Sequence, residues 1–162
     1  MSKIKVAMVG GGIGGFIGEI HRAAMRLDDR FELVAGALSS DATRAMESAK
    51  ELGVRGYESW QALLEKEQDT VDCVVIVTPN DSHAEIATAA LEAGYYVILD
   101  KPMTRTLDEA VALAGVAQSN NSGIAMTYTY TGYPMVREMR KRILNGEIGK
   151  VRTVSVDYRQ GW

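Results

Sequence analysis

The chain has 162 residues, of which 46% are hydrophobic and 24% charged, and its formal net charge is −3. This is enough apolar sequence for one good core, and the slight acidity gives no reason to expect nucleic acid or an anionic membrane as a partner. No apolar run approaches the roughly 18 residues of a membrane span, and no secretory signal is recognisable. The lone Cys73 cannot form an internal disulfide. We therefore expect a cytoplasmic protein.

Taken in chain order, short apolar runs alternate with segments whose apolar residues have helical spacing. The runs predicted as strands are residues 4–9, 31–38, 55–57, 71–79, 95–100 and 123–129. The segments predicted as helices are residues 16–27, 42–52 and 60–66, a helix that ends at Gly94 and a helix that ends near Ser119. This alternation with short connections predicts an α/β protein with a doubly wound parallel sheet.

Polar residues at the starts of the predicted helices support these boundaries. The predicted N-terminal caps are Asp41, Ser59, Asn80 or Asp81, and Thr106. Thr106 stands three residues before Glu109, which is the spacing of a capping box. Gly53 follows the second helix, where a glycine commonly ends a helix in the left-handed conformation.

The pattern changes after about residue 128. Pro134 suits the first turn of a helix that runs to Leu144, and residues 151–158 alternate between apolar and polar side chains. Such alternation predicts a strand with one solvent-exposed face. We therefore expect one domain at residues 1–127, followed by a linker helix and the first strand of a truncated second α/β domain at residues 128–162. Because a lone strand edge invites pairing with another chain, we also expect a homo-oligomer.

Six glycines fall within residues 10–18, directly after the first predicted strand. Gly10, Gly12 and Gly15 satisfy the pattern G-x-G-x-x-G, at the junction of strand and helix where this motif binds dinucleotides. The first allows a tight turn, the second lets backbone approach a pyrophosphate, and the third permits close packing of helix on strand. Ile13 is expected in the same binding loop. The alternative is a glycine-rich structural turn; a phosphate-binding Walker A loop is excluded because no Lys-Ser or Lys-Thr follows.

The end of the second predicted strand indicates which dinucleotide binds. Ser39 and Ser40 stand where an Asp or Glu would bind the ribose 2′-hydroxyl of NAD, and Arg44 follows one turn later. Two hydroxyls near a guanidinium suit a 2′-phosphate. NADP is therefore slightly favoured over NAD, although Asp41 could reach the ribose if it were not used as a helix cap.

Four segments together carry a family resemblance. They are "VAMVGGGIGG" near the N-terminus, "TPNDSH" from Thr78, "AGYYVILDKPMT" from Ala93, and "YPMVREMRKRILNGEIGKV" from Tyr133. In this order they resemble the Gfo/Idh/MocA oxidoreductases, the group of glucose–fructose oxidoreductase and inositol dehydrogenase. The resemblance implies a Rossmann domain that binds NAD or NADP at residues 1–127, joined to a C-terminal domain with the substrate site. It also implies hydride transfer between the nicotinamide and a sugar, inositol or related polyol.

The family's Glu-Lys-Pro signature is present as Asp100, Lys101 and Pro102. The resemblance assigns Lys101 to catalysis near the nicotinamide, where an ammonium can hydrogen-bond the alcohol oxygen and ease its proton loss. It places Asp100 and Pro102 beside the cofactor with Lys101. A solvated loop lysine is the alternative, and either isomer of the Pro102 peptide bond is open.

The segment after the fourth predicted strand matches the part of the family that lies against the cofactor. The matching residues are Thr78, Pro79 and Asn80, followed by His83. Considered alone, His83 is better explained as a histidine satisfied at a helix start. His21 is equally ambiguous, because the family's histidine after the glycine loop usually comes sooner.

The resemblance places Tyr128, Tyr130 and Tyr133 in the substrate crevice, although core packing explains tyrosines equally well. The catalytic Asp and His of the family's second domain have no counterpart in the chain. A non-catalytic dinucleotide-binding module, which senses redox state or docks a partner, is therefore the alternative to an enzyme; Lys101 favours the enzyme. One cysteine and two distant histidines give no metal site.

Overall fold

The computed structural model describes residues 2–27 and 29–161. The chain separates into two compact units, residues 1–127 and residues 128–162. Each unit is described by itself.

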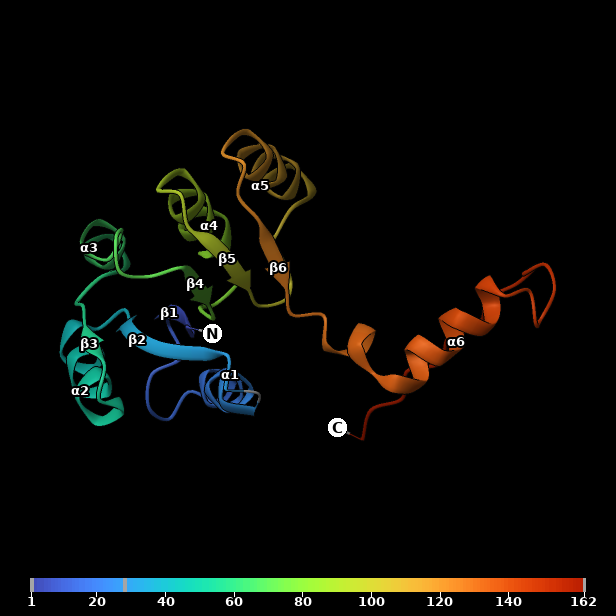
Figure 1. The fold of residues 1–162 in the computed structure, drawn as a ribbon, viewed down its shortest axis with the longest axis horizontal. Helices are drawn as coiled ribbons and strands as arrows, with labels where there is room; N and C mark the ends of the chain where they lie inside the picture. The colour runs from blue at the N-terminus through green and yellow to red at the C-terminus, as the bar shows by residue number, and fades with distance from the viewer. Residues whose placement is uncertain (1, 28, 162) are drawn as a thin grey trace. The chain divides into compact units, whose positions relative to one another are not determined.

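The first unit is built on a parallel sheet. Its strands are β1 (Ile4–Val9), β2 (Phe31–Ala37), β3 (Arg55–Gly56), β4 (Cys73–Ile76), β5 (Tyr96–Leu99) and β6 (Ile124–Met126). Their spatial order is β3-β2-β1-β4-β5-β6, and every neighbouring pair is parallel (Figure 1). This is the strand order of the dinucleotide-binding Rossmann fold, so the predicted fold is confirmed. The order reverses direction between β1 and β4, and such a switch point leaves a crevice at the carboxyl ends of the strands.

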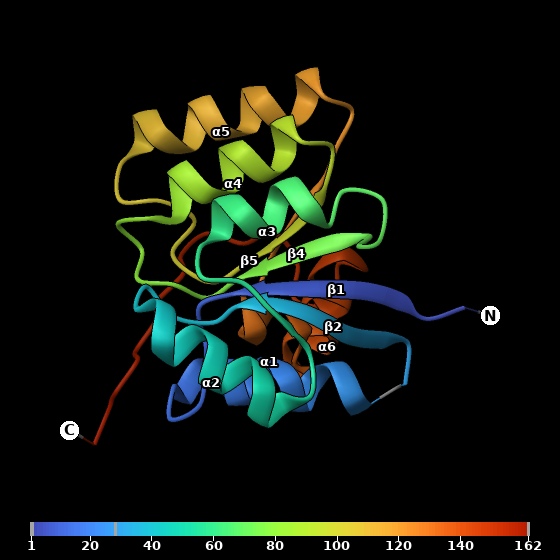
Figure 2. The same ribbon diagram turned by 90° about the vertical axis from the view of Figure 1, so that its left-hand side faces the viewer.

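Helices cover both faces of the sheet. They are α1 (Phe16–Leu27), α2 (Ala42–Leu52), α3 (Trp60–Lys66), α4 (His83–Glu92) and α5 (Leu107–Ser119). Figure 2 shows α1 and α2 on one face and α3, α4 and α5 on the other. The connections are therefore wound in both directions from the centre of the sheet, as the alternation of strands and helices predicts.

The central strand β1 contributes to the core on both faces. Ala7 and Val9 belong to the hydrophobic cluster under α3 and α4, whereas Val6 and Met8 belong to the cluster under α1 and α2. All four side chains are at most 3% exposed. A parallel strand that is buried on both faces needs an uninterrupted apolar sequence, which is why this run does not alternate with polar residues.

Most of the predicted caps are confirmed. Asp41 and Ser59 accept hydrogen bonds from main-chain N–H groups of the helices that follow them, and Thr106 forms the complete capping box. The helix α4 differs, because Ser82 occupies the cap position in place of Asn80 or Asp81. Its hydroxyl donates to Thr78 and to the carbonyl of Pro79, and so makes no cap bond.

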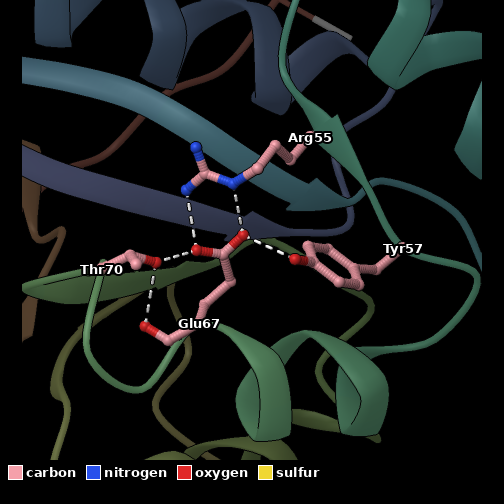
Figure 3. Close-up of polar contacts among 4 residues, drawn as sticks. All are labelled: Arg55, Tyr57, Glu67 and Thr70. Atoms are coloured by element: carbon pink, nitrogen blue, oxygen red, sulfur yellow. Dashed lines mark hydrogen bonds and ion pairs between the residues drawn. The ribbon is translucent and has the colours of Figure 1, made fainter.

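A buried carboxylate joins the short strand β3 to the end of α3 (Figure 3). Glu67 accepts two hydrogen bonds of 2.7 Å from the guanidinium of Arg55 and one of 2.7 Å from the hydroxyl of Tyr57. The hydroxyl of Thr70 also donates to it. The Glu67 side chain is 2% exposed, and hydrogen bonding from Arg55 lowers the pKa of its carboxyl to about 2. The cluster holds an edge strand of only two residues in place.

The second unit contains a 3₁₀ turn at Thr129–Gly132 and the helix α6 (Pro134–Leu144), with Pro134 in its first turn as predicted. Residues 151–161 form neither helix nor strand. The strand predicted at residues 151–158 is therefore absent. A strand requires a ladder of hydrogen bonds to a second strand, and the described residues of this unit include none.

Candidate functional site

A cavity of about 610 Å³ lies at the carboxyl ends of β1, β2 and β4, at the switch point of the sheet. Its lining comes from the glycine loop and from residues 37–40, 58–61, 77–79 and 81–82. A smaller cavity of about 220 Å³ shares Gly11, Leu38 and Ser39 with the first and extends along the rest of the loop to Arg44. The larger volume is typical of a site for a small organic ligand.

The glycine loop is fixed to the end of β2 by main-chain hydrogen bonds. The N–H groups of Gly10 and Gly12 donate to the carbonyls of Ala37 and Leu38, each at 2.9 Å. Gly10 has a φ of 79°, and a Cβ there would lie 3.1 Å from the main chain at Thr78. Only glycine adopts this positive φ readily and carries no Cβ that would contact the main chain at Thr78. The cavity wall at this point is therefore bare backbone.

Two further N–H groups of the loop are also used within the chain. Ile13 donates to the hydroxyl of Ser48 at 3.2 Å, and Gly15 donates to the carbonyl of Gly12 at 3.0 Å. The N–H groups of Gly11 and Gly14 have no hydrogen-bond partner among residues 2–27 and 29–161. These are the donors that the loop itself can offer to an anionic ligand, together with the first N–H groups of α1.

The close packing predicted for Gly15 belongs to Gly18. A Cβ at Gly18 would lie 2.1 Å from the carbonyl oxygen of Gly11, whereas one at Gly15 would lie 3.1 Å from the nearest atom. The sequence did contain a signal, because Gly18 lies inside the helix α1, where a glycine costs stability unless contact requires it. Arg22 of the same helix is buried, and its guanidinium donates to the carbonyl of Gly11.

The residues predicted to contact the 2′ position of the ribose lie together at the end of β2. Ser39 and Ser40 line the larger cavity, and Ser39 and Arg44 line the smaller one. Asp41 accepts a hydrogen bond from the N–H of Arg44 at 2.8 Å, and its own N–H donates to the hydroxyl of Ser39 at 3.1 Å. Its carboxylate therefore caps α2, as the sequence favours.

The loop after β4 divides into residues at the cavity and residues away from it. Thr78 and Pro79 line the cavity; Asn80 is exposed and is not part of the lining. His83 is 1% exposed, with Nδ1 2.8 Å from the carbonyl oxygen of Pro102 and Nε2 2.9 Å from that of Thr78. The ring nitrogens are thus directed at main-chain oxygens, which differs from the expected contact of His83 with a cofactor.

The signature after β5 lies on the next strand of the sheet. Lys101 is exposed, and its peptide bond to Pro102 is cis. Asp100 accepts a hydrogen bond of 2.8 Å from the hydroxyl of Thr127, and Nε2 of His21 lies 3.8 Å from its carboxylate. Burial lowers the pKa of His21, and the charge of Asp100 opposes this effect. None of these side chains lines the two cavities described above.

In the second unit, three tyrosines form an exposed cluster. The rings of Tyr130 and Tyr133 meet edge to face with centroids 5.4 Å apart, and the hydroxyls of Tyr130 and Tyr158 lie 2.7 Å apart. Tyr128 is also exposed. Tyr158 is not among the predicted substrate residues.

No group of three or more His, Cys, Asp or Glu side chains in residues 2–27 and 29–161 could hold a metal ion. No helix within the same ranges is long and apolar enough to cross a membrane.

Comparison with known proteins relates this geometry to a family. The family described as "Oxidoreductase family, NAD-binding Rossmann fold" matches residues 4–128. The uncharacterized oxidoreductase YfiI of Bacillus subtilis is 38% identical over 98% of this chain and 42% of its own length. Levoglucosan dehydrogenase of Pseudarthrobacter phenanthrenivorans is 31% identical over 100% of this chain and 42% of its own length.

A solved structure agrees with both. The inositol dehydrogenase homolog from Azotobacter vinelandii, complexed with NADH and myo-inositol, has a TM-score of 0.89 and 41% identity over 93% of this chain and 41% of its own. The chain thus spans about two fifths of the length of these relatives. The glycine loop, the strand order and the family match together show that the chain belongs to the Gfo/Idh/MocA oxidoreductases, of which it holds the NAD-binding Rossmann fold.

Proposed function

We propose that the chain is the cofactor-binding part of an NAD(P)-dependent dehydrogenase that acts on a CH–OH group of a sugar, inositol or related polyol. The observation that carries the proposal is the 610 Å³ cavity at the switch point of the sheet, walled by the glycine loop. Open α/β sheets bind their ligands at this position. Two relatives, a levoglucosan dehydrogenase and an inositol dehydrogenase homolog, support the substrate class.

The residues around the cavity fit a dinucleotide. The wall at Gly10 is bare backbone. The N–H groups of Gly11 and Gly14 have no hydrogen-bond partner among the described residues, and they are therefore available to phosphate oxygens. The N-terminus of α1 starts at Phe16, directly after the loop, and a helix N-terminus favours negative charge. The loop would therefore hold the pyrophosphate, and the rest of the cavity would hold a nucleoside.

The same geometry supports NADP over NAD. Arg44 and Ser39 line the smaller cavity beside the loop, and they offer a cation and a hydroxyl to a 2′-phosphate. The nearby carboxylate of Asp41 is used in capping α2. A site that selects NAD needs a free carboxylate at this point to accept a hydrogen bond from the ribose 2′-hydroxyl.

Lys101 is the residue that we propose for the chemistry. A bound nicotinamide would supply the hydride acceptor or donor. The exposed ammonium of Lys101, just after β5, would hydrogen-bond the substrate oxygen and take part in moving its proton. In the alternative, a non-catalytic dinucleotide-binding module, a lysine at this position would have no effect on any reaction.

Titration of the chain with NADPH and NADH, followed by nicotinamide fluorescence, tests the cofactor proposal. We expect tighter binding of NADPH, and we expect Arg44→Ala to weaken NADPH about tenfold, or about 1.4 kcal/mol, while NADH changes little. Arg140→Ala, a change on an exposed face of α6, is the matched control. If neither dinucleotide binds, the proposed function fails. If NADH binds more tightly, only the preference for NADP is wrong.

A further inference from the structure

The side chain of His83 connects the two loops on which the proposed site depends. Its Nε2 lies 2.9 Å from the carbonyl oxygen of Thr78, which lines the large cavity. Its Nδ1 lies 2.8 Å from the carbonyl oxygen of Pro102, the residue after Lys101. The ring therefore spans the gap between the ends of β4 and β5, 1% exposed at the first residue of α4.

Both contacts reach main-chain oxygens, and a carbonyl oxygen can only accept a hydrogen bond. A neutral imidazole donates from one nitrogen, and an imidazolium donates from both. A bond to Pro102 therefore requires a proton on Nδ1. Because buried polar groups without partners are costly, this link is a strong restraint on the loop after β5.

A further restraint on this loop comes from the opposite side. The hydroxyl of Thr127, at the end of β6, donates to Asp100 at 2.8 Å. Asp100 and Pro102 are the two chain neighbours of Lys101. Asp100 is tied to the residue that follows β6, and Pro102 to the first residue of α4. Lys101 itself is exposed between them.

We infer that His83 is a positioning residue, which fixes the main chain at Lys101 relative to the cavity wall by donating from Nδ1 to the carbonyl of Pro102. The inference rests on the proposed catalytic role of Lys101 for its functional meaning. It assigns no contact with cofactor or substrate to His83. The relevant bond is the one to Pro102. Nε2 faces the carbonyl oxygen of Thr78 and donates to it only when that nitrogen also carries a proton.

Substitution of His83 by Asn or by Gln distinguishes the contact with Pro102 from the contact with Thr78. Asn places its amide nitrogen near the position of Nδ1, and Gln near the position of Nε2. His83→Asn thus keeps a donor toward Pro102, and His83→Gln keeps a donor toward Thr78. His83→Phe fills the space with no donor.

The first measurement uses the 162-residue chain. Long-range ¹H–¹⁵N spectra report whether each ring nitrogen carries a proton, and His83→Asn identifies the signals because the chain has only 2 histidines. We expect a protonated Nδ1. An unprotonated Nδ1 overturns the inference, because the bond to Pro102 cannot then exist.

The second measurement is the chemical shift of the Lys101 and Met103 amides and the exchange of the Asp100 amide, which donates to the carbonyl of Ile76 at 3.0 Å. We expect His83→Gln and His83→Phe to shift the first two and to speed exchange at Asp100 about tenfold or more, while His83→Asn stays close to the wild type. Thermal unfolding of all variants is recorded alongside. If Asn and Gln behave alike and exchange follows thermal stability only, His83 has a general structural role and the inference is wrong.

Turnover is then compared in a longer form of the protein that spans the length of its relatives. We expect kcat to fall about tenfold or more in His83→Gln, with near-wild-type kcat in His83→Asn and an unchanged KM for the cofactor. Lys101→Ala distinguishes the proposed catalytic role of Lys101 from the proposed positioning role of His83. Unchanged turnover in Lys101→Ala removes the proposed function, whereas the protonation and exchange results still decide whether His83 fixes the loop.

Discussion

Gly12 and Gly15 lie three residues apart in one loop, yet a methyl group would meet different surroundings at each. A Cβ at Gly12 would lie 2.6 Å from the carbonyl oxygen of Leu38, and one at Gly15 would lie 3.1 Å from that of Gly12. We expect Gly12→Ala to destabilise the fold by about 1–3 kcal/mol, as overpacking does. We expect Gly15→Ala to fold well but to bind dinucleotide about tenfold more weakly, because Gly15 lines the smaller cavity.

Thermal unfolding and fluorescence titration of both variants test this difference. Gly115→Ala on α5 is the control, because a Cβ there meets nothing within 4 Å, and it should leave binding unchanged. Equal losses of stability at Gly12 and Gly15 would contradict the prediction.

Lys101→Ala is the second prediction at this scale. We expect turnover of the longer form to fall about 10²-fold, the usual effect of losing a positioned acid–base group. Cofactor affinity should stay within about twofold, since Lys101 lines neither cavity. Lys150→Ala, at an exposed position in the second unit, is the control. A turnover number equal to that of the wild type would remove the catalytic role.

Residue types and their spacing could locate much of the site but not the partner of each side chain. The positions of Gly10, Ser39 and Thr78 follow from strand ends, because parallel strands bring their carboxyl ends to one edge. The partners of His83 do not follow, because they are main-chain oxygens, which every residue carries. Gly18 was missed for a related reason: six glycines in nine residues allow several registers, and only a contact in space selects one.

At the scale of elements, the Glu67 cluster predicts a pH dependence of stability. The folded pKa of Glu67 is about 2, below the ordinary 4.5. Its stabilising contribution is therefore complete above the unfolded pKa and is lost as pH falls from about 5 toward 2. The full contribution is about 3 kcal/mol at most.

Glu67→Gln tests this prediction by urea unfolding between pH 3 and pH 7. We expect the variant to be less stable than the wild type at pH 7 and the difference to shrink as pH falls. Glu65→Gln is the control, because Glu65 lies exposed on α3, two residues before Glu67. A difference between Glu67→Gln and wild type that is constant with pH would show that the carboxylate charge is not what holds β3.

The elements of the first unit were predictable because each carries its own local signal. Strands buried on both faces are continuous apolar runs, and caps such as Asp41 and Thr106 satisfy helix N–H groups from one side chain. The strand expected at residues 151–158 shows the limit of this reasoning. Its alternating pattern is present, but a strand also needs a partner, and a sequence pattern does not supply one.

At the scale of the whole molecule, we predict that the 162-residue chain binds dinucleotide but does not turn over. The first unit has a complete sheet with two hydrophobic clusters, which is sufficient for folding and binding. The chain spans about two fifths of its relatives, and we expect no counterpart in it of the Asp and His that the resemblance assigns to the family's second domain. Without these groups, orientation of a substrate is lost.

A panel of sugars and inositols with NAD and NADP, followed at the nicotinamide absorbance, tests this in the chain and in the longer form. Turnover by the chain alone would mean that residues 128–162 build a substrate site by themselves.

Sedimentation of the same samples tests the expected self-association. That expectation now has less support, since the strand edge on which it rested is absent from the structure.

The position of β1 in the sheet also has a consequence during synthesis on the ribosome. β1 is made first, and β2 can cover one of its edges once Ala37 has emerged, but its other edge pairs only with β4, which is complete at Ile76. At about 5–20 residues per second, the ribosome needs roughly 2–8 s to make the sequence between these points. For that time β1 carries open main-chain donors and acceptors along one edge, and we therefore expect this interval to be the one in which the nascent chain is most prone to misassembly.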